Sequence, residues 1–334
     1  MQTKNSVKLI VDTDIGDDID DAFALLYLCR HSCVTVEAIT TVYKNTAQRA
    51  KIAKKLSGGK IPVYAGANRP LEKDVRILLG ETVRENGLID IDHYSVAASN
   101  ETYEGEDAAG YIVSALRRNP HEITLLAIGP LTNLAQAAMR DKEALRLAKQ
   151  IVIMGGMFAQ NAPEWNIEIV PHAARIVFGS GANIVLVPYD ATHLCSMTER
   201  EVEFFRNAKG ECDEYLAAMM VRWIDHYDPN WDGKKKLPVL HDVLAAEVAV
   251  KPELFSYGRV RFDLFTEGEN RDATVACGNG AFETAVLSGV DYDAYRAEFY
   301  AAVHPDVMAR FAAESTRDVY AAEKGARKGR RVRI

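Results

Sequence analysis

A cluster of acidic residues near the N-terminus is the clearest chemical feature of this chain. Six aspartates fall within the ten residues of the segment Asp12-Thr-Asp-Ile-Gly-Asp-Asp-Ile-Asp-Asp21. Carboxylates this close repel one another, so each resists ionisation unless a cation is bound. Oxygen ligands suit Ca²⁺ or Mg²⁺, and Gly16 permits a sharp turn between Asp14 and the aspartates that follow. The cluster therefore indicates a divalent-cation site.

Simpler interpretations account for part of this cluster. Asp20 and Asp21 could cap the helix that follows, because a helix N-terminus favours negative charge. Asp17 and Asp18 could be solvated loop residues, or they could share the metal. Neither interpretation explains Asp14, which ends an apolar strand.

Strands and helices alternate along most of the chain, as periodicity and turn residues indicate. Strands are expected at Val7–Asp14, Val34–Thr41, Ile61–Val63, Ile123–Ile128, Gln150–Met154 and Asn183–Val187. Helices are expected at Asp21–Leu28, Thr46–Leu56 (with a basic outer face), Ala108–Arg117, Leu131–Met139, Pro171–Phe178, Glu211–Trp223 and His241–Val250. Late strands at Val260–Thr266 and Thr274–Cys277 could form an antiparallel addition.

This alternation predicts an α/β fold with an open, mainly parallel central sheet flanked by helices. Such sheets bind ligands beyond the carboxyl ends of their strands, and the first strand delivers Asp12 and Asp14 to that edge. Residues 72–106 show no clear period, and we expect them to help cover the site. We expect a single domain over residues 1–334, with a basic tail at about 320–334.

Composition excludes several classes of protein. The 334 residues carry a net charge of −7, so the chain is a poor candidate for binding nucleic acid polymers, whose phosphates require a basic surface. No apolar run approaches the roughly 20 residues that span a membrane, and the N-terminus has no signal-peptide core. Five scattered cysteines predict buried free thiols rather than disulfides or a zinc site. We therefore expect a cytoplasmic protein with no membrane partner.

Six motifs, in order along the chain, resemble the inosine-uridine-preferring nucleoside hydrolase family. They are Asp12-Thr-Asp-Ile-Gly…Asp20-Asp21-Ala22, Ile39-Thr-Thr-Val-Tyr-Lys-Asn45, Ile128-Gly-Pro-Leu-Thr-Asn133, Met154-Gly-Gly156, Glu164-Trp-Asn166 and His241-Asp242. The similarity spans roughly residues 7–302. One motif alone would be weak, but six in the same order make coincidence an inadequate explanation.

The resemblance implies a nucleoside hydrolase-like fold and hydrolysis of the N-glycosidic bond of inosine/uridine-type ribonucleosides, in nucleoside salvage. Its partner would be a small-molecule nucleoside, and its cofactor Ca²⁺. Asp14, Asp21, Asp242 and the backbone carbonyl of Ile128 match the metal ligands. Asp14 also matches the base that deprotonates the metal-bound water, and His241 matches the general acid for the leaving base. Family members are commonly oligomeric, so the resemblance implies a homo-oligomer, a dimer or a tetramer.

Ribose-binding residues follow from the same resemblance. Asp20 matches the ligand of the 2′-hydroxyl, and the residues that match other ribose contacts are Asn45, Asn161, Glu164 and Asn166. The segment before Glu164 is shorter than in the family, which weakens the match of Asn161. The spacing from Gly16 to the Asp20-Asp21 pair is two residues longer than in the shorter form of the motif. We prefer that pair because an apolar helix follows it directly.

Base recognition is less specific. Trp223, Tyr227 and Trp231 form an aromatic stretch ahead of His241, and one of them could stack on the base. Trp223 could equally pack in the core at helical spacing. Trp165 is open to the same two interpretations.

The chemistry of N-glycosidic cleavage agrees with these residue types. Breaking the ribosyl C–N bond develops positive charge on the sugar, which carboxylates stabilise electrostatically. A bound metal lowers the pKa of water, and a general acid contributes roughly 10²–10⁴-fold in rate. Histidine suits the acid role because its proton is available near neutral pH.

Two other functions remain open at this point. Asp12-Thr-Asp14 partly matches the start of haloacid-dehalogenase phosphatases, in which the first Asp is a nucleophile and the second a general acid. That class leaves the Glu164-Trp-Asn166 and His241-Asp242 motifs unexplained. A ribose- or calcium-binding module without catalysis is the other, although intact Asp14 and His241 argue against it.

Overall fold

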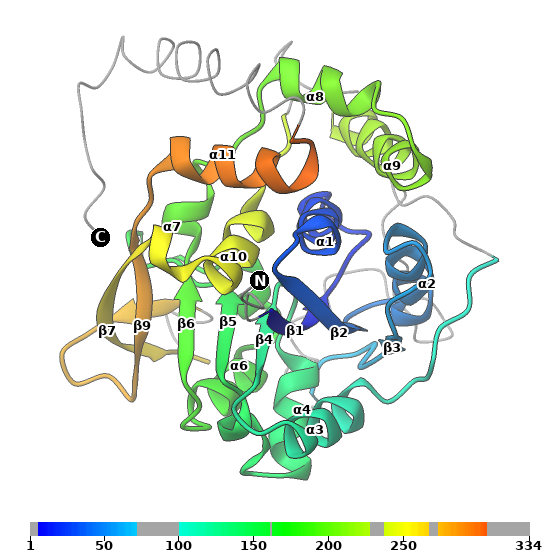
Figure 1. Cartoon of the computed structure of the whole chain (residues 1–334). Coiled ribbons are helices and arrows are strands. Elements are labelled where there is room, and N and C mark those ends of the chain that lie inside the picture. Colours follow the sequence, from blue (N-terminus) through cyan, green and yellow to red (C-terminus); the bar gives the residue numbers. More distant parts are fainter. Residues whose placement is uncertain (1–5, 72–99, 161, 228–236, 267–272, 306–334) are drawn as a thin grey trace, which may run out of the picture.

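One nine-stranded sheet runs through the computed structural model (Figure 1), which describes residues 6–71, 100–160, 162–227, 237–266 and 273–305. Its order is β3-β2-β1-β4-β5-β6-β9-β7-β8. The strands are β1 (Val7–Thr13), β2 (Val34–Thr41), β3 (Val63–Ala65), β4 (Ile123–Ala127), β5 (Gln150–Met154), β6 (Ile184–Val187), β7 (Ser256–Leu264), β8 (Thr274–Ala276) and β9 (Phe282–Gly289). Neighbours from β3 to β9 pair in parallel, and β7 and β8 are antiparallel additions. The predicted open, mainly parallel sheet is confirmed.

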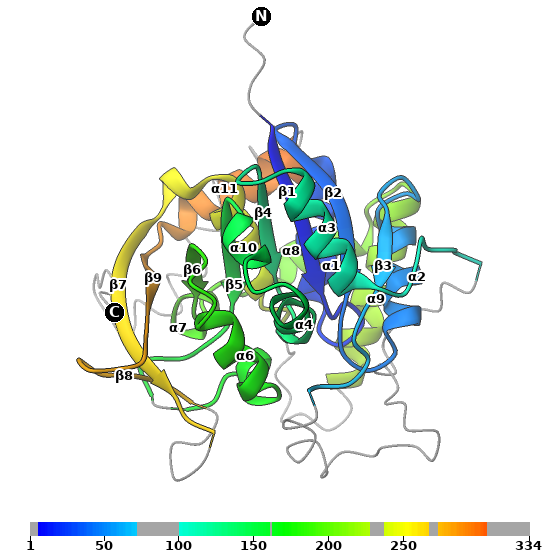
Figure 2. The ribbon, with the colours of Figure 1, turned by 90° about the horizontal axis from the view of Figure 1, so that it is seen from below.

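Helices cover both faces of this sheet (Figures 1 and 2). One face packs against α1 (Asp20–Arg30), α2 (Thr46–Leu56), α8 (Glu199–Arg206), α9 (Glu211–Tyr227), α10 (His241–Val250) and α11 (Tyr292–Val303). The other face packs against α3 (Ala108–Arg118), α4 (Thr132–Arg140) and α6 (Pro171–Phe178). The remaining short elements are α5 (Trp165–Glu168), α7 (Tyr189–Thr192), η2 (Ala144–Leu147) and η3 (Pro252–Leu254).

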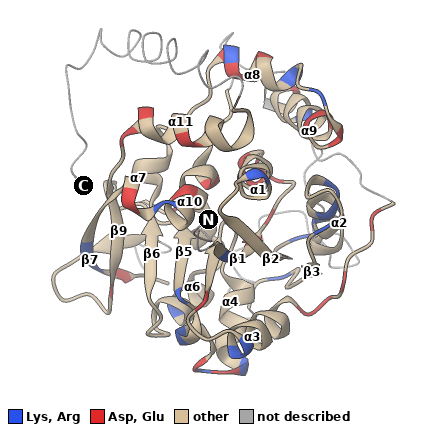
Figure 3. Cartoon of the chain, in the orientation of Figure 1, with Lys and Arg blue, Asp and Glu red and all other residues tan. Residues whose placement is uncertain are grey.

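Central strands are apolar on both sides because helices cover both faces. In β1, Leu9 and Val11 belong to one hydrophobic core and Ile10 to the other. The strands β4, β5 and β6 carry no charged residue, whereas charges gather on the helices and loops around them (Figure 3).

The chain winds in two directions from β1. It first builds β2 and β3 on one side of β1, and then crosses to build β4, β5 and β6 on the other side. The strand order reverses between β1 and β4, and α/β sheets bind ligands beyond the carboxyl ends of the strands at such a reversal. Asp14 directly follows β1, and Ile128 directly follows β4.

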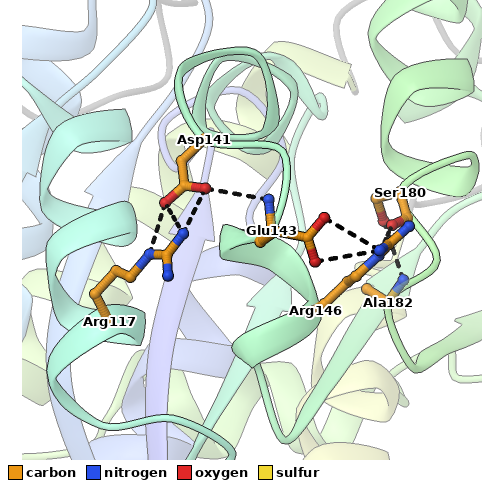
Figure 4. Close-up of polar contacts among 6 residues, drawn as sticks. All are labelled: Arg117, Asp141, Glu143, Arg146, Ser180 and Ala182. Atoms are coloured by element: carbon orange, nitrogen blue, oxygen red, sulfur yellow. Dashed lines mark hydrogen bonds and ion pairs between the residues drawn. The ribbon is translucent and has the colours of Figure 1, made fainter.

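The opposite edge of the sheet is closed by a surface network (Figure 4). Arg117 at the end of α3 donates twice to Asp141, over 2.7 and 2.8 Å. Arg146 pairs with Glu143 at 3.2 Å and donates to the Ser180 carbonyl at 2.8 Å. These exposed contacts join the segments that enter β4, β5 and β6, although each contributes little free energy.

Most expected elements exist, but several were missed. The prediction omitted α5, α7, α8, α11 and β9. The strand β3 begins two residues later than expected, and β7 runs over Ser256–Leu264 rather than Val260–Thr266. The predicted antiparallel addition is confirmed. Residues 72–99 and the basic tail lie outside the described residues.

Two smaller expectations need correction. The basic outer face predicted for α2 holds only in part, because Lys51 and Lys55 are half-buried whereas Arg49 and Lys54 are buried. All five cysteines are free, as expected, but only Cys195 is buried. Within the described ranges, no helix combines the length and apolar character needed to cross a membrane.

Candidate active site

Three aspartates from distant parts of the chain meet at the carboxyl edge of the sheet. One carboxylate oxygen from each of Asp20, Asp21 and Asp242 lies within 4.8 Å of the others, and all three residues are buried. Asp20 and Asp21 begin α1, whereas Asp242 lies in the first turn of α10. The backbone N–H of Asp242 donates to Asp20 Oδ2 at 3.2 Å, which joins the two helix starts. The structure therefore brings together the two segments that the sequence singled out.

Asp14 lies beside this group without belonging to the set within 4.8 Å. Burial raises its pKa to about 7, while the Arg49 guanidinium opposes that rise. Its negative charge in turn adds to the raised pKa values of Asp20, Asp21 and Asp242. Asp14 is thus close enough to interact electrostatically with every member of the group.

The electrostatics of the group favour a bound cation. Burial is the largest cause of the raised pKa values of Asp20, Asp21 and Asp242, and repulsion between neighbouring carboxylates adds to it. The hydroxyl of Thr13 donates to Asp21 Oδ1 and opposes this effect for one oxygen. Buried carboxylate oxygens that repel one another form a donor set that fits a hard divalent cation.

Asp17 and Asp18 point to other partners. Asp17 pairs with Arg49 at 2.8 Å and with Lys44 at 3.2 Å. Asp18 Oδ1 accepts a hydrogen bond from the N–H of Ile19 at 2.6 Å. The structure does not bring either carboxylate into the group of three.

Arg49 was missed as a site residue by sequence reasoning. Its side chain is fully buried, and besides Asp17 it donates to the carbonyls of Tyr43 (2.7 Å) and Ile15 (2.9 Å). Arg49 therefore holds the loop after β1 against the loop after β2. So many carboxylates suggest a cationic side chain beside them. Helical spacing alone, however, did not show that Arg49 faces the site.

Asn166 links the ends of β4 and β5. Its amide donates to the carbonyls of Ile128 and Met154, both at 3.3 Å. Glu164 accepts from the N–H of Gly156 at 2.9 Å and from that of Asn166 at 3.0 Å, and burial raises its pKa to about 7. The Ile128 carbonyl, expected as a metal ligand, thus accepts a hydrogen bond from one expected ribose ligand, Asn166.

The other expected ribose ligands lie apart or outside the described residues. Asn45 is the N-cap of α2, and its side chain accepts from the N–H of Gln48 at 3.2 Å. It is half-buried at the loop after β2, on the same edge of the sheet. Asn161 lies outside the described residues, so the structure does not place it.

His241 begins α10 directly before Asp242. Its Nδ1 lies 2.7 Å from the hydroxyl of Thr192, and its ring stacks on Tyr189 at 5.4 Å. Both partners belong to α7, and sequence reasoning missed them. Four residues are too few to show a helical period, so no local signal marked this element.

The aromatic candidates divide in the structure. Trp223 is buried in the core, as its helical spacing allowed. Trp165 is 44% exposed between Glu164 and Asn166. The side chain of Tyr227 and the whole of Trp231 lie outside the described residues.

A buried acidic group and an adjacent histidine at the switch point of a parallel sheet define an α/β enzyme with a candidate cation site. The family model of the inosine-uridine preferring nucleoside hydrolases matches residues 9–297. The chain therefore belongs to this family. It is a nucleoside hydrolase, an enzyme that hydrolyses ribonucleosides to ribose and a free base.

Relatives span plants and bacteria. Uridine nucleosidase 1 of Arabidopsis thaliana is 31% identical over 272 residues, covering 78% of this chain and 79% of that protein. The solved structure of the plant nucleoside hydrolase PpNRh1 is 27% identical with a TM-score of 0.72, covering 89% of this chain and 98% of that one. A purine-preferring ribonucleoside hydrolase from Gardnerella vaginalis is 25% identical with a TM-score of 0.70, at the same coverage. Relatives of similar fold thus carry names with different base preferences.

Proposed function

We propose that this nucleoside hydrolase binds Ca²⁺ at the acidic group and cleaves inosine and uridine. The observation that carries the proposal is the meeting of Asp20, Asp21 and Asp242 within 4.8 Å, with His241 next in sequence to the last of them. The acids at the start of α1 and the start of α10 thereby lie close together, which supports one shared site.

Asp14, Asp21, Asp242 and the carbonyl of Ile128 would hold the cation. The set consists of oxygen donors alone, and three of them are buried carboxylates that repel without a counter-charge. When bound, the cation supplies Lewis-acid polarisation of the attacking water and orients the ribose diol.

Two residues of the chain carry out the two proton transfers. Asp14 accepts a proton from water as the water oxygen bonds to the anomeric carbon of ribose. The bond from that carbon to the base nitrogen breaks, and His241 gives a proton to the departing base. The products are ribose and the neutral free base, so atoms and charge balance.

Ribose is held by the remaining expected ligands. We assign the 2′-hydroxyl to Asp20 and the other ribose contacts to Asn45, Asn161, Glu164 and Asn166. The carboxylates of this set also surround the sugar where positive charge develops in the transition state, which stabilises that charge electrostatically. Binding and rate acceleration therefore depend on the same groups.

A nucleoside panel assayed for free ribose tests the proposal. We expect ribose release from inosine and uridine, loss of activity on adding a chelator, and recovery on adding Ca²⁺. Asp14→Ala and Asp242→Ala should abolish turnover of every nucleoside, because each removes a metal ligand. The matched control is Asp225→Asn, an exposed aspartate of α9 that should leave turnover unchanged. Full activity in the presence of the chelator would contradict the metal role.

Three further properties are proposed on the same basis. We propose a homo-oligomer, a dimer or a tetramer, which light scattering of the purified enzyme tests.

We propose a cytoplasmic role in nucleoside salvage, consistent with five free cysteines and tested by cell fractionation. We also propose one nucleoside hydrolase domain over residues 1–334, which cooperative unfolding in a single transition would support.

A further inference from the structure

The short helix α7 follows β6 at the carboxyl edge of the sheet and contacts the candidate acid in two ways. The hydroxyl of Thr192 lies 2.7 Å from Nδ1 of His241, and Thr192 is fully buried. The ring of Tyr189 stacks on the imidazole at a centroid distance of 5.4 Å and an interplanar angle of 23°. One contact fixes an atom of the ring, and the other fixes its plane.

We propose that Thr192 and Tyr189 are positioning residues that hold the imidazole of His241 through Nδ1 and through its ring plane, so that Nε2 gives the proton to the leaving base. The inference rests on the proposed role of His241 as general acid. It goes beyond that role because it says which ring nitrogen donates the proton. It also names the two residues that determine which nitrogen this is.

The count of hydrogens supports Nε2 as the donor. An imidazolium carries hydrogen on both nitrogens, so Nδ1–H must donate to the Thr192 hydroxyl oxygen. The hydroxyl hydrogen then faces the carbonyl of Tyr189, 3.5 Å away. When the base leaves, the Nε2 proton bonds to the base nitrogen, and the neutral ring keeps Nδ1–H. The Thr192 bond is the same before and after proton transfer, so the step needs no rotation of either side chain.

The anchoring of α7 explains how this orientation is set relative to ribose. The N–H of Tyr189 donates to the Gly156 carbonyl at 2.8 Å. The carboxylate of Asp190 accepts the N–H groups of Phe158 and Ala159 at 2.7 and 2.8 Å. The loop that precedes Glu164 and the residues that hold His241 are therefore tied to one element.

Substitutions of Thr192 distinguish a role in positioning the His241 ring from a role in the stability of the fold. Thr192→Val keeps the shape but removes the oxygen, and Thr192→Ser keeps the oxygen. For Thr192→Val we expect kcat on inosine to fall about 10–100-fold, the range typical of a lost orienting hydrogen bond, with little change in KM. Thr192→Ser should restore most of the activity.

A nitrophenyl riboside provides the internal control, because its leaving group departs without a proton. On this substrate Thr192→Val should retain nearly wild-type kcat. Thr35→Val, at the exposed start of β2, is the matched substitution and should change neither substrate's turnover. Equal losses of Thr192→Val on both substrates would show a merely structural role and overturn the proposal.

The ring hydrogen can also be observed without turnover. Nitrogen-15 NMR of the neutral His241 ring should show hydrogen on Nδ1 in the wild type and a shift toward Nε2 in Thr192→Val. Hydrogen on Nε2 in the wild type would overturn the positioning role even if Thr192→Val fails to fold. By contrast, absence of ribose release by the wild type would contradict the proposed function. An inosine rate unaffected by His241→Ala would contradict the acid role of His241. Both results differ from one in which only the Thr192 variants behave unexpectedly.

Discussion

Gly129 lies directly after Ile128, at the point where the ends of β1 and β4 approach each other. A Cβ atom added there would lie 2.8 Å from both the backbone nitrogen and Oδ1 of Asp14. Real side chains do not sit so close to backbone atoms, so the expected base would have to shift. The lack of a Cβ at Gly129 thus leaves room for the carboxylate that we propose as the base.

We predict that Gly129→Ala lowers kcat/KM for nucleosides by at least about 10-fold, since misplacement by an ångström can cost about 10²-fold in rate. Steady-state ribose release measures the effect. Gly278→Ala is the matched control, because a Cβ there meets nothing within 4 Å. Wild-type kinetics in Gly129→Ala would show that the loop moves freely and that the close approach does not position Asp14.

Among the secondary-structure elements, α2 does more than cover the sheet. Its buried Arg49 pairs with Asp17 and binds the carbonyls of Ile15 and Tyr43, so the helix holds two loops of the site. Tyr43 and Lys44 both have positive φ angles of 67° and 57°, a strained conformation for residues with side chains. The contacts of Arg49 contribute to holding this turn in place.

We expect Arg49→Met to lower the free energy of unfolding by about 3–5 kcal/mol, because it leaves Asp17 as a buried charge with less compensation. Urea denaturation followed by circular dichroism measures the change. Lys51→Met, on the partly exposed face of the same helix, should change it by less than about 0.5 kcal/mol. Similar effects of the two substitutions would argue that Arg49 is not a structural cation.

Two of the helices that the sequence prediction missed begin with recognisable capping residues. Thr198 and Glu201 form a capping box at the start of α8, and the side chain of Asp291 caps α11. The strand β9 buries alternate residues from Phe282 onward and ends at Gly289. These signals were present in the sequence, whereas α7 is too short to have any.

For the molecule as a whole, the sheet concentrates buried acids at one edge. Burial raises the pKa values of Asp12, Asp14 and Glu164 to about 7, far above those of exposed carboxyls. Between about pH 4 and pH 7 the native state therefore binds more protons than the unfolded state. The stability of the metal-free protein must fall as pH rises through this window.

We predict that the melting temperature in a chelator decreases from pH 5 to pH 7.5. Excess Ca²⁺ should reduce or reverse the decrease, because a ligand that binds only the native state stabilises it and needs ionised carboxylates. Thermal melts followed by near-ultraviolet circular dichroism measure both series. A melting temperature in chelator that is constant or rises over this range would contradict the assignment of buried, neutral acids.

The sequence by itself determined the alternation of strands and helices, the acidic turn after β1 and the family motifs. These features are local, because they depend on side-chain period, turn residues and the order of short segments. These local patterns did not determine which distant residues meet, although the family resemblance implied that Asp21 and Asp242 share one site. Asp242 reaches Asp20 across 222 positions, and Thr192 reaches His241 across 49.

Only the tertiary structure decided the contact of Thr192 with His241, the inward direction of Arg49 and the insertion of β9 between β6 and β7. The physical reason is that burial acts on whole faces of the sheet. Each helix faces the sheet with the side that buries its apolar residues. A charged side chain on that side must then pair with polar groups of neighbouring strands, helices or loops. Neighbours across a sheet are set by this packing, which no local pattern records.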